Sequence, residues 1–118
     1  MAGTVLVVDD DSATVGMIRE VLEMEGYRVV RAVDGESVRI ALIEQPHLIL
    51  LDINMPGMDG PEVSRRLRAE PATAHIPIVV MSSHVARGGV PPEMPHDDRL
   101  TKPFALDALS AIVARWVT

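Results

Sequence analysis

The sequence predicts an α/β fold in which helices cover both faces of a parallel five-stranded sheet. Short apolar runs alternate along the chain with segments of helical period, as in repeated strand–helix units. The apolar runs lack polar alternation, which is typical of strands buried on both faces of a sheet. The chain has 118 residues, of which 47% are hydrophobic. This length suits one domain spanning residues 1–118.

The first half of the chain contains three predicted strands and two predicted helices. The first helix begins at the capping residue Asp11 or Ser12, runs to about Met24 and ends before Gly26. The second helix follows a turn at 34–35 and stops at 45–46, where Pro46 disfavours helix. The expected strands are Val5–Val8, Tyr27–Val33 and Leu48–Leu51.

The second half predicts two more strands and two clear helices. The strands are expected at Ile78–Met81 and Arg99–Thr101, and one helix at Pro61–Arg68, because proline suits a first helical turn. A final helix begins near Ala105. It places five apolar residues on one stripe: Leu106, Leu109, Ile112, Val113 and Trp116.

The segment 84–97, between the fourth and fifth strands, opposes helix formation. It contains two adjacent glycines and three prolines. We therefore expect the fourth helix to be short or irregular.

Carboxylates follow two of the predicted strands. Asp9 and Asp10 come after the first strand, and Asp52 comes after the third. If these strands are parallel neighbours, the three carboxylates meet at the carboxyl edge of the sheet. Their repulsion requires either raised pKa values or a hard cation such as Mg²⁺, which also accepts phosphate oxygens. Metal-assisted phosphoryl chemistry is therefore the leading hypothesis.

Composition excludes several other classes. With 17 acidic and 11 basic residues the net charge is −6, so we expect no nucleic-acid binding by this domain. The chain has no cysteine, which excludes disulfides and thiolate chemistry. The apolar stretches are too short to cross a membrane and no secretory signal is present, so a cytoplasmic location is expected. The histidines show no paired metal spacing and are interpreted as surface or loop residues: His47, His75, His84 and His96.

Four motifs together resemble the receiver domain of two-component response regulators, which is CheY-like. They occur in the order of that family, each at a predicted strand end: Leu6–Asp10, Leu51–Gly60, Ser82 after Ile76–Met81, and Leu100–Phe104. The resemblance covers essentially the whole chain. It implies a doubly wound, flavodoxin-like (βα)5 domain with strand order 2-1-3-4-5.

The resemblance also implies roles for the residues at the sheet edge. Asp52 is expected to be the phosphoacceptor. Asp9, Asp10, Asp52 and the backbone carbonyl of Asn54 are expected to hold Mg²⁺. Lys102 is expected to contact the phosphoryl oxygens, a role that suits a flexible ammonium group.

Further expectations from the resemblance concern switching and dephosphorylation. Ser82 is expected to donate its hydroxyl to the phosphoryl group, although the adjacent Ser83 is an alternative. The bond before Pro103 is expected to be cis. Asn54 and His84 are expected to tune dephosphorylation.

The positions that the resemblance marks also have simpler readings. Asp11 is better explained as a helix cap than as a metal ligand. Many receivers carry an aromatic switch where this chain has Arg99. Arginine is costly to bury, so aromatic switching is in doubt here.

Three function classes follow. The favoured one is a receiver that accepts phosphate from a sensor histidine kinase or histidine phosphotransfer protein and switches binding of a downstream protein, as a monomer or weak dimer. The alternative is a pseudo-receiver that binds proteins without phosphorylation. An enzyme is disfavoured, because no second acid stands at Asn54 and no cap domain encloses a substrate. Flavin binding is disfavoured because no phosphate-binding loop follows the first strand.

Overall fold

The computed structural model describes residues 3–33, 36–53, 60–83 and 94–117. In this part of the chain, all strands form one parallel sheet in the predicted order β2-β1-β3-β4-β5. The strands are β1 (Gly3–Val8), β2 (Tyr27–Ala32), β3 (Leu48–Asp52), β4 (Ile78–Ser83) and β5 (Asp98–Lys102). The helices are α1 (Ser12–Met24), α2 (Glu36–Glu44), α3 (Gly60–Ala69) and α4 (Leu106–Trp116).

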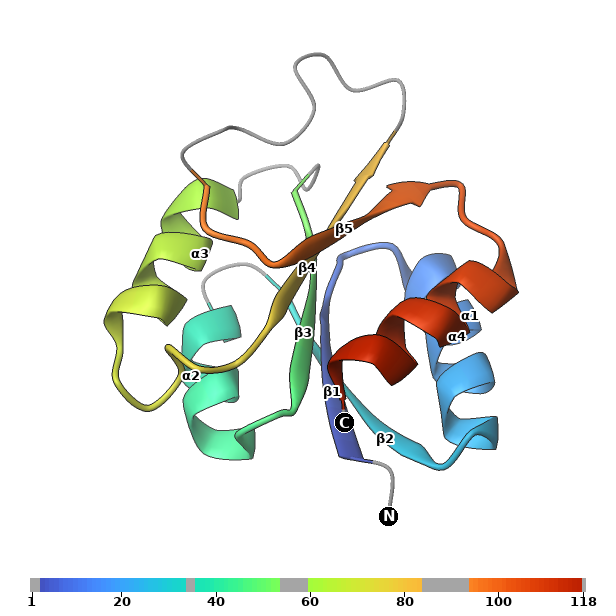
Figure 1. Cartoon of the computed structure of the whole chain (residues 1–118), viewed down its shortest axis with the longest axis horizontal. Coiled ribbons are helices and arrows are strands. Elements are labelled where there is room, and N and C mark those ends of the chain that lie inside the picture. Colours follow the sequence, from blue (N-terminus) through green and yellow to red (C-terminus); the bar gives the residue numbers. More distant parts are fainter. Residues whose placement is uncertain (1–2, 34–35, 54–59, 84–93, 118) are drawn as a thin grey trace.

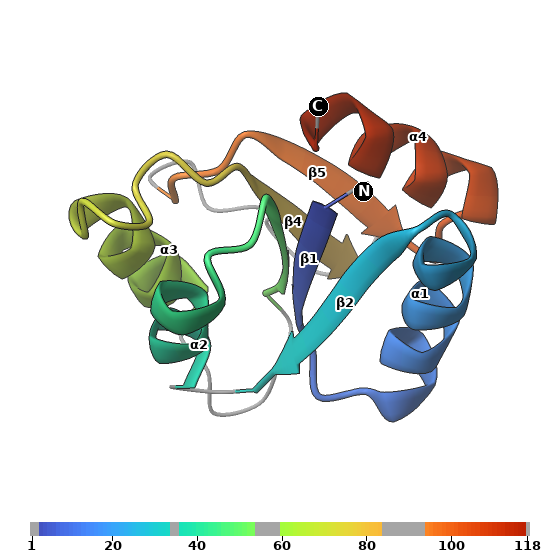
Figure 2. The same ribbon diagram turned by 90° about the horizontal axis from the view of Figure 1, so that it is seen from below.

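Helices cover both faces of the sheet, so the fold is doubly wound as predicted. Figure 1 shows α1 and α4 on one side of the sheet and α2 and α3 on the other, and Figure 2 shows the same two layers from below. Right-handed crossovers between parallel strands produce this arrangement. Among the described residues, no helix is both long and apolar enough to cross a membrane.

Alternate residues of the strands supply two separate cores. In β1, Leu6 and Val8 belong to the cluster that includes α2 and α3, whereas Val5 and Val7 belong to the cluster that includes α1 and α4. Every residue of β3 is buried. Burying one such aliphatic side chain contributes about 1.5–3 kcal/mol. The unbroken apolar runs are therefore explained by cores on both sides of the sheet.

The first helix has the boundaries that its sequence indicates. Asp11 caps it, because its Oδ1 accepts the Ala13 N–H at 3.1 Å and its Oδ2 accepts the Thr14 hydroxyl at 2.7 Å. The Thr14 bond, followed by the Ala13 bond, lowers the pKa of Asp11. Gly26 follows the helix with φ +94°, a conformation that favours glycine. The helix-cap interpretation of Asp11 is confirmed.

Two expectations about the second half have different outcomes. Leu106 lies on the predicted stripe by its spacing, but it is 49% exposed and is not part of the core that Leu109 and Val113 enter. It is the first residue of α4 and precedes the stretch that packs on the sheet through Leu109 and Val113. The segment between β4 and β5, where the sequence predicts a short or irregular helix, lies mostly outside the described residues. Its described part, 94–97, forms neither helix nor strand.

Residues 94–97 are attached to α3 and to the start of β4. The side chain of Met94 is buried in the cluster that includes α2 and α3. The hydroxyl of Ser64 donates to the Pro95 carbonyl, and Arg68 pairs with Asp97. Asp97 also accepts the Ile78 N–H at 2.8 Å. These contacts fix where the chain enters β5.

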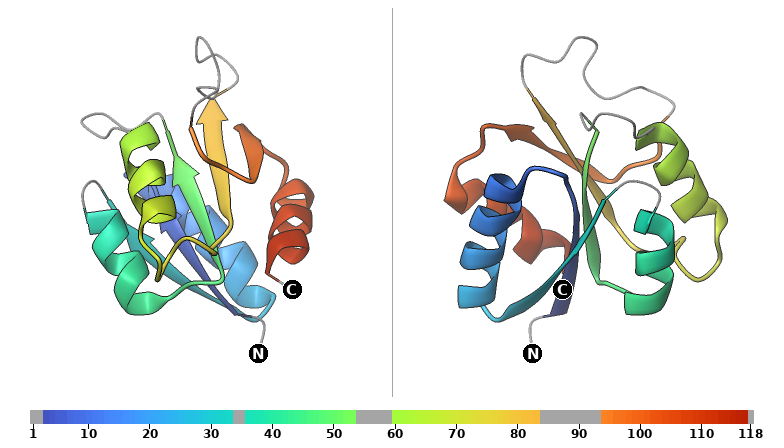
Figure 3. Two further views of the ribbon diagram at one scale, coloured as in Figure 1. Left: turned by 60° about the vertical axis from the view of Figure 1, so that its left-hand side comes forward. Right: turned by 180° about the vertical axis from the view of Figure 1, so that it is seen from behind.

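The first and last described residues, Gly3 and Val117, lie at the amino edge of the sheet. The start of β1 and the end of α4 are close together in both views of Figure 3. Gly3 has φ +127°, and a Cβ there would lie 2.9 Å from Cγ1 of Val117 and 3.1 Å from Nδ1 of His47. Glycine therefore allows β1 to begin against the end of the chain.

Candidate functional site

The carboxyl edge of the sheet brings three acidic residues together. Asp9 follows β1 directly, Asp10 is next, and Asp52 is the last residue of β3. One carboxylate oxygen from each lies within 4.8 Å of the others. Asp9 and Asp52 are buried, whereas Asp10 is exposed. The convergence predicted from the two apolar runs is therefore present.

This donor set fits a hard divalent cation. All three groups offer carboxylate oxygens, the ligands that Mg²⁺ prefers, and the exposed side of Asp10 leaves room for water or phosphate oxygens. Burying two acids so close together is costly without positive charge. The residues present therefore suit a magnesium ion at this edge.

Lys102 supplies positive charge inside the same cluster. It ends β5, and its Nζ lies 2.8 Å from Oδ2 of Asp9 and 3.4 Å from Oδ2 of Asp52. Burial lowers the pKa of Lys102, but the hydrogen bond to Asp9 and the charges of Asp52 and Asp9 outweigh burial and raise the pKa overall. The ammonium group therefore stays charged between the two buried carboxylates.

The loop between β1 and α1 is held from two sides. The other oxygen of Asp9, Oδ1, accepts the Asp11 N–H at 2.9 Å. On β2, Arg31 donates from Nε to the Asp9 carbonyl at 3.2 Å and from Nη2 to the Asp10 carbonyl at 3.0 Å. Sequence reasoning missed Arg31, because a lone exposed arginine in a strand pattern gives no sign of what it contacts.

Ser82 lies at the same edge on β4. Met81 pairs with Asp52, so Ser82 is one residue further toward the carboxyl end, and it is 6% exposed. Ser83 pairs with Lys102, but its side chain is not described. Asn54 and His84 lie outside the described residues, and their expected roles remain predictions. Arg99 is exposed on β5.

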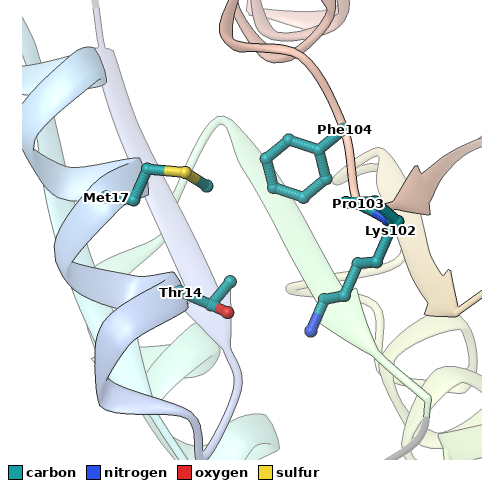
Figure 4. A pocket seen from close by; sticks show the side chains of 5 residues that line it. All are labelled: Thr14, Met17, Lys102, Pro103 and Phe104. Atoms are coloured by element: carbon teal, nitrogen blue, oxygen red, sulfur yellow. The ribbon is translucent and has the colours of Figure 1, made fainter.

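A pocket of about 390 Å³ lies beside Lys102, between α1 and the start of the connection to α4. Thr14, Met17, Lys102, Pro103 and Phe104 line it, and Figure 4 shows the Met17 side chain pointing toward the Phe104 ring. The Lys102–Pro103 peptide bond is cis, the form that the resemblance implies. The acidic cluster thus borders a mainly apolar surface.

Comparison with known families settles which family has this arrangement. Residues 5–114 match the response regulator receiver domain family. The chain belongs to that family. The expected resemblance, the CheY-like fold and the place in two-component signalling are therefore confirmed.

Curated relatives of this receiver domain are longer proteins. The chain is 42% identical over 109 residues to the response regulator PleD of Caulobacter vibrioides, covering 88% of this chain and 24% of PleD. It is 43% identical over 115 residues to the transcriptional regulatory protein PrrA of Mycobacterium tuberculosis, covering 92% of this chain and 47% of PrrA. The receiver domain thus spans about a quarter and about a half of these two relatives.

Solved structures similar to this receiver domain include one with a metal. The receiver domain of a Pseudomonas aeruginosa sensor histidine kinase, which holds a magnesium ion in its active-site cleft, has a TM-score of 0.89 and 29% identity, covering 99% of this chain and 98% of that one. The chemotaxis response regulator CheY4 of Vibrio cholerae has a TM-score of 0.86 and 26% identity, covering 98% of each chain.

Proposed function

We propose that this chain is a cytoplasmic phosphoacceptor receiver. Asp52 accepts a phosphoryl group from a histidine kinase or histidine phosphotransfer protein in a Mg²⁺-dependent reaction, and the modified domain changes its affinity for a downstream protein. The observation that carries the proposal is the position of Asp52, buried at 3.4 Å from Lys102 and clustered with Asp9 and Asp10. Family membership supports the same function.

Each residue at this edge of the sheet has its own role in the phosphoryl transfer. A carboxylate oxygen of Asp52 bonds to phosphorus while the bond from phosphorus to the donor nitrogen breaks, and the electron pair leaves with that nitrogen. Asp9, Asp10 and Asp52 would hold Mg²⁺, which neutralises charge on the transferring group. Lys102 would bind a phosphoryl oxygen through Nζ. Ser82 would donate its hydroxyl to another oxygen.

The proposal limits catalysis to the domain's own phosphorylation and dephosphorylation. Asp10 is exposed at this edge of the sheet, which leaves the acidic cluster open to a phosphodonor carried by a partner protein. Asn54 and His84 would set the rate at which water removes the phosphoryl group.

One observation favours the pseudo-receiver as a second candidate. Arg99 stands exposed where many receivers have an aromatic switch residue. On this second candidate, the domain binds its partners with an affinity that does not depend on phosphorylation. This candidate predicts no Mg²⁺-dependent modification.

Intact mass after incubation with acetyl phosphate separates the two candidates. The measurement uses the wild-type chain and Asp52→Asn, each with Mg²⁺ and with EDTA. One phosphoryl adduct that requires both Mg²⁺ and Asp52 is expected. No adduct in any condition, together with no fluoroberyllate binding, favours the pseudo-receiver. An adduct on Asp52→Asn places the phosphoacceptor elsewhere.

A further inference from the structure

An arginine on the edge strand β2 binds the backbone of the loop that presents two of the acids. The Nε of Arg31 lies 3.2 Å from the Asp9 carbonyl oxygen, and its Nη2 lies 3.0 Å from the Asp10 carbonyl oxygen. Both are side chain to main chain contacts, and they join residues 22 and 21 positions apart. One planar guanidinium therefore spans two consecutive carbonyl groups.

The strand register explains how Arg31 reaches this loop. Arg31 pairs with Val7, and the last pair of the β1–β2 ladder is Val8 with Ala32. Asp9 and Asp10 come after that last pair and before the cap residue of α1. The guanidinium thus continues the connection between the strands beyond the point where backbone pairing ends.

We propose that Arg31 is a positioning residue for the cation site. Its forked bond to the two carbonyls fixes the β1–α1 loop so that the carboxylates of Asp9 and Asp10 stay grouped with Asp52. This inference rests on the proposed function, since it assumes that these acids bind Mg²⁺. Residues that orient metal ligands through hydrogen bonds commonly change metal affinity when they are replaced.

Positioning and simple charge make opposite predictions for Arg31. A guanidinium near a divalent cation repels it, so removing the charge alone makes Mg²⁺ bind more tightly. Loss of the two hydrogen bonds from Arg31 frees the loop that carries Asp9 and Asp10, so Mg²⁺ binds more weakly. The sign of the change in affinity therefore distinguishes the two roles.

Two substitutions separate the fork from the charge. Arg31→Gln removes both, whereas Arg31→Lys keeps the charge but cannot reproduce a planar two-pronged contact. Arg28→Gln is the matched control. Arg28 lies on the same strand, but its Nη1 pairs with Oε1 of Glu44 at 2.7 Å, away from the β1–α1 loop.

The test is the Kd for Mg²⁺, measured by titration calorimetry at constant ionic strength, after circular dichroism shows that each variant is folded. We expect about tenfold weaker binding for Arg31→Lys, a smaller weakening for Arg31→Gln because loss of the positive charge favours the cation, and no change for Arg28→Gln. Tighter binding by Arg31→Gln with unchanged binding by Arg31→Lys would show a charge effect only. Unchanged binding by both would overturn the proposal.

Phosphorylation by acetyl phosphate gives a second readout. In Arg31→Lys, the Mg²⁺ concentration for half-maximal rate should rise about tenfold, and in Arg31→Gln it should rise by less, while the rate at saturating Mg²⁺ stays at the wild-type value in both. A lower saturating rate with unchanged half-saturation contradicts positioning of the cation ligands. If wild type binds Mg²⁺ but forms no adduct, the proposed function fails and this inference stands. If wild type binds no Mg²⁺, both fail.

Discussion

Removal of the Asp98 carboxylate should loosen the junction between β5 and α4. Its Oδ2 accepts the indole N–H of Trp116 at 2.9 Å and a guanidinium N–H of Arg115 at 3.3 Å, and its Oδ1 accepts the Arg99 N–H at 2.9 Å. Trp116 also packs against the cluster that includes α1 and α4. The perturbations are Asp98→Ala and Asp98→Asn.

The magnitude follows from these three contacts. A hydrogen bond to a charged acceptor contributes about 1.5–3 kcal/mol, which applies to the Trp116 bond. The Arg115 side chain is 70% exposed, so its pairing adds less than about 1 kcal/mol. Asp98→Ala should cost about 2 kcal/mol, or about 8 °C in Tm for a chain of this length. Asp98→Asn keeps one acceptor and should cost about 1 kcal/mol.

A double-mutant cycle with Trp116→Phe isolates the carboxylate–indole bond. Urea unfolding followed by circular dichroism should give a coupling energy of about 1.5 kcal/mol between the two positions. Coupling below about 0.3 kcal/mol would refute the reasoning, because the bond would then contribute nothing beyond packing.

Low pH provides a further check on Asp98. Burial raises the pKa of Asp98, but its hydrogen bonds with Trp116, Arg99 and Arg115 outweigh burial and lower the pKa overall. The carboxylate's contribution to stability is therefore complete above the unfolded-state pKa of about 3.9 and is lost as pH falls through the lower folded-state value. The difference in unfolding free energy between wild type and Asp98→Asn should shrink below about pH 4.

Three other substitutions give contrasting expectations. Leu50→Ala, in the fully buried β3, should cost about 2–5 kcal/mol of unfolding free energy, whereas Leu106→Ala should change it by less than about 0.5 kcal/mol; similar losses in urea unfolding would contradict the burial argument. Gly16→Ala should stabilise α1 by about 0.5–1 kcal/mol, because nothing lies within 4 Å of the new Cβ. Gly3→Ala should instead lower Tm, because its Cβ would lie too close to Val117. A change in Tm of the same sign for both variants in calorimetry would count against this contrast. Lys102→Gln should cost about 3 kcal/mol in EDTA and less at saturating Mg²⁺, since the cation replaces the lost charge; an equal loss in both buffers would mean that the ammonium stabilises the fold in some other way.

The order of the strands and the grouping of the acids could be predicted because both depend on short local patterns. Unbroken apolar runs such as Leu48–Leu51 identify buried parallel strands, and an acid directly after such a run must lie at the carboxyl edge. Asp9 and Asp52 are predictable in this way, because their placement needs no contact between distant residues. Lys102 needed the family resemblance, because a lone lysine before proline has no distinctive local pattern.

Contacts between distant parts of the chain could not be predicted. Arg31 reads as an ordinary exposed strand residue until the register places it beside the loop after β1. Met94 lies in a glycine- and proline-containing segment, yet its side chain is buried in a core. Leu106 has the correct helical spacing, but spacing cannot show where a helix first touches the sheet. These outcomes depend on tertiary packing, which overrides local preference.

Gly3 lies close to Val117. The order of the elements along the chain can therefore be changed without changing the order of the strands in the sheet. A short linker between Val117 and Gly3 would cost little loop-closure entropy, and new termini would be opened at another surface turn. In such a circular permutant, β3 could come before β1 in the polypeptide while remaining its neighbour in space. The acidic cluster should then still assemble, because strand adjacency rather than synthesis order brings Asp9 and Asp52 together.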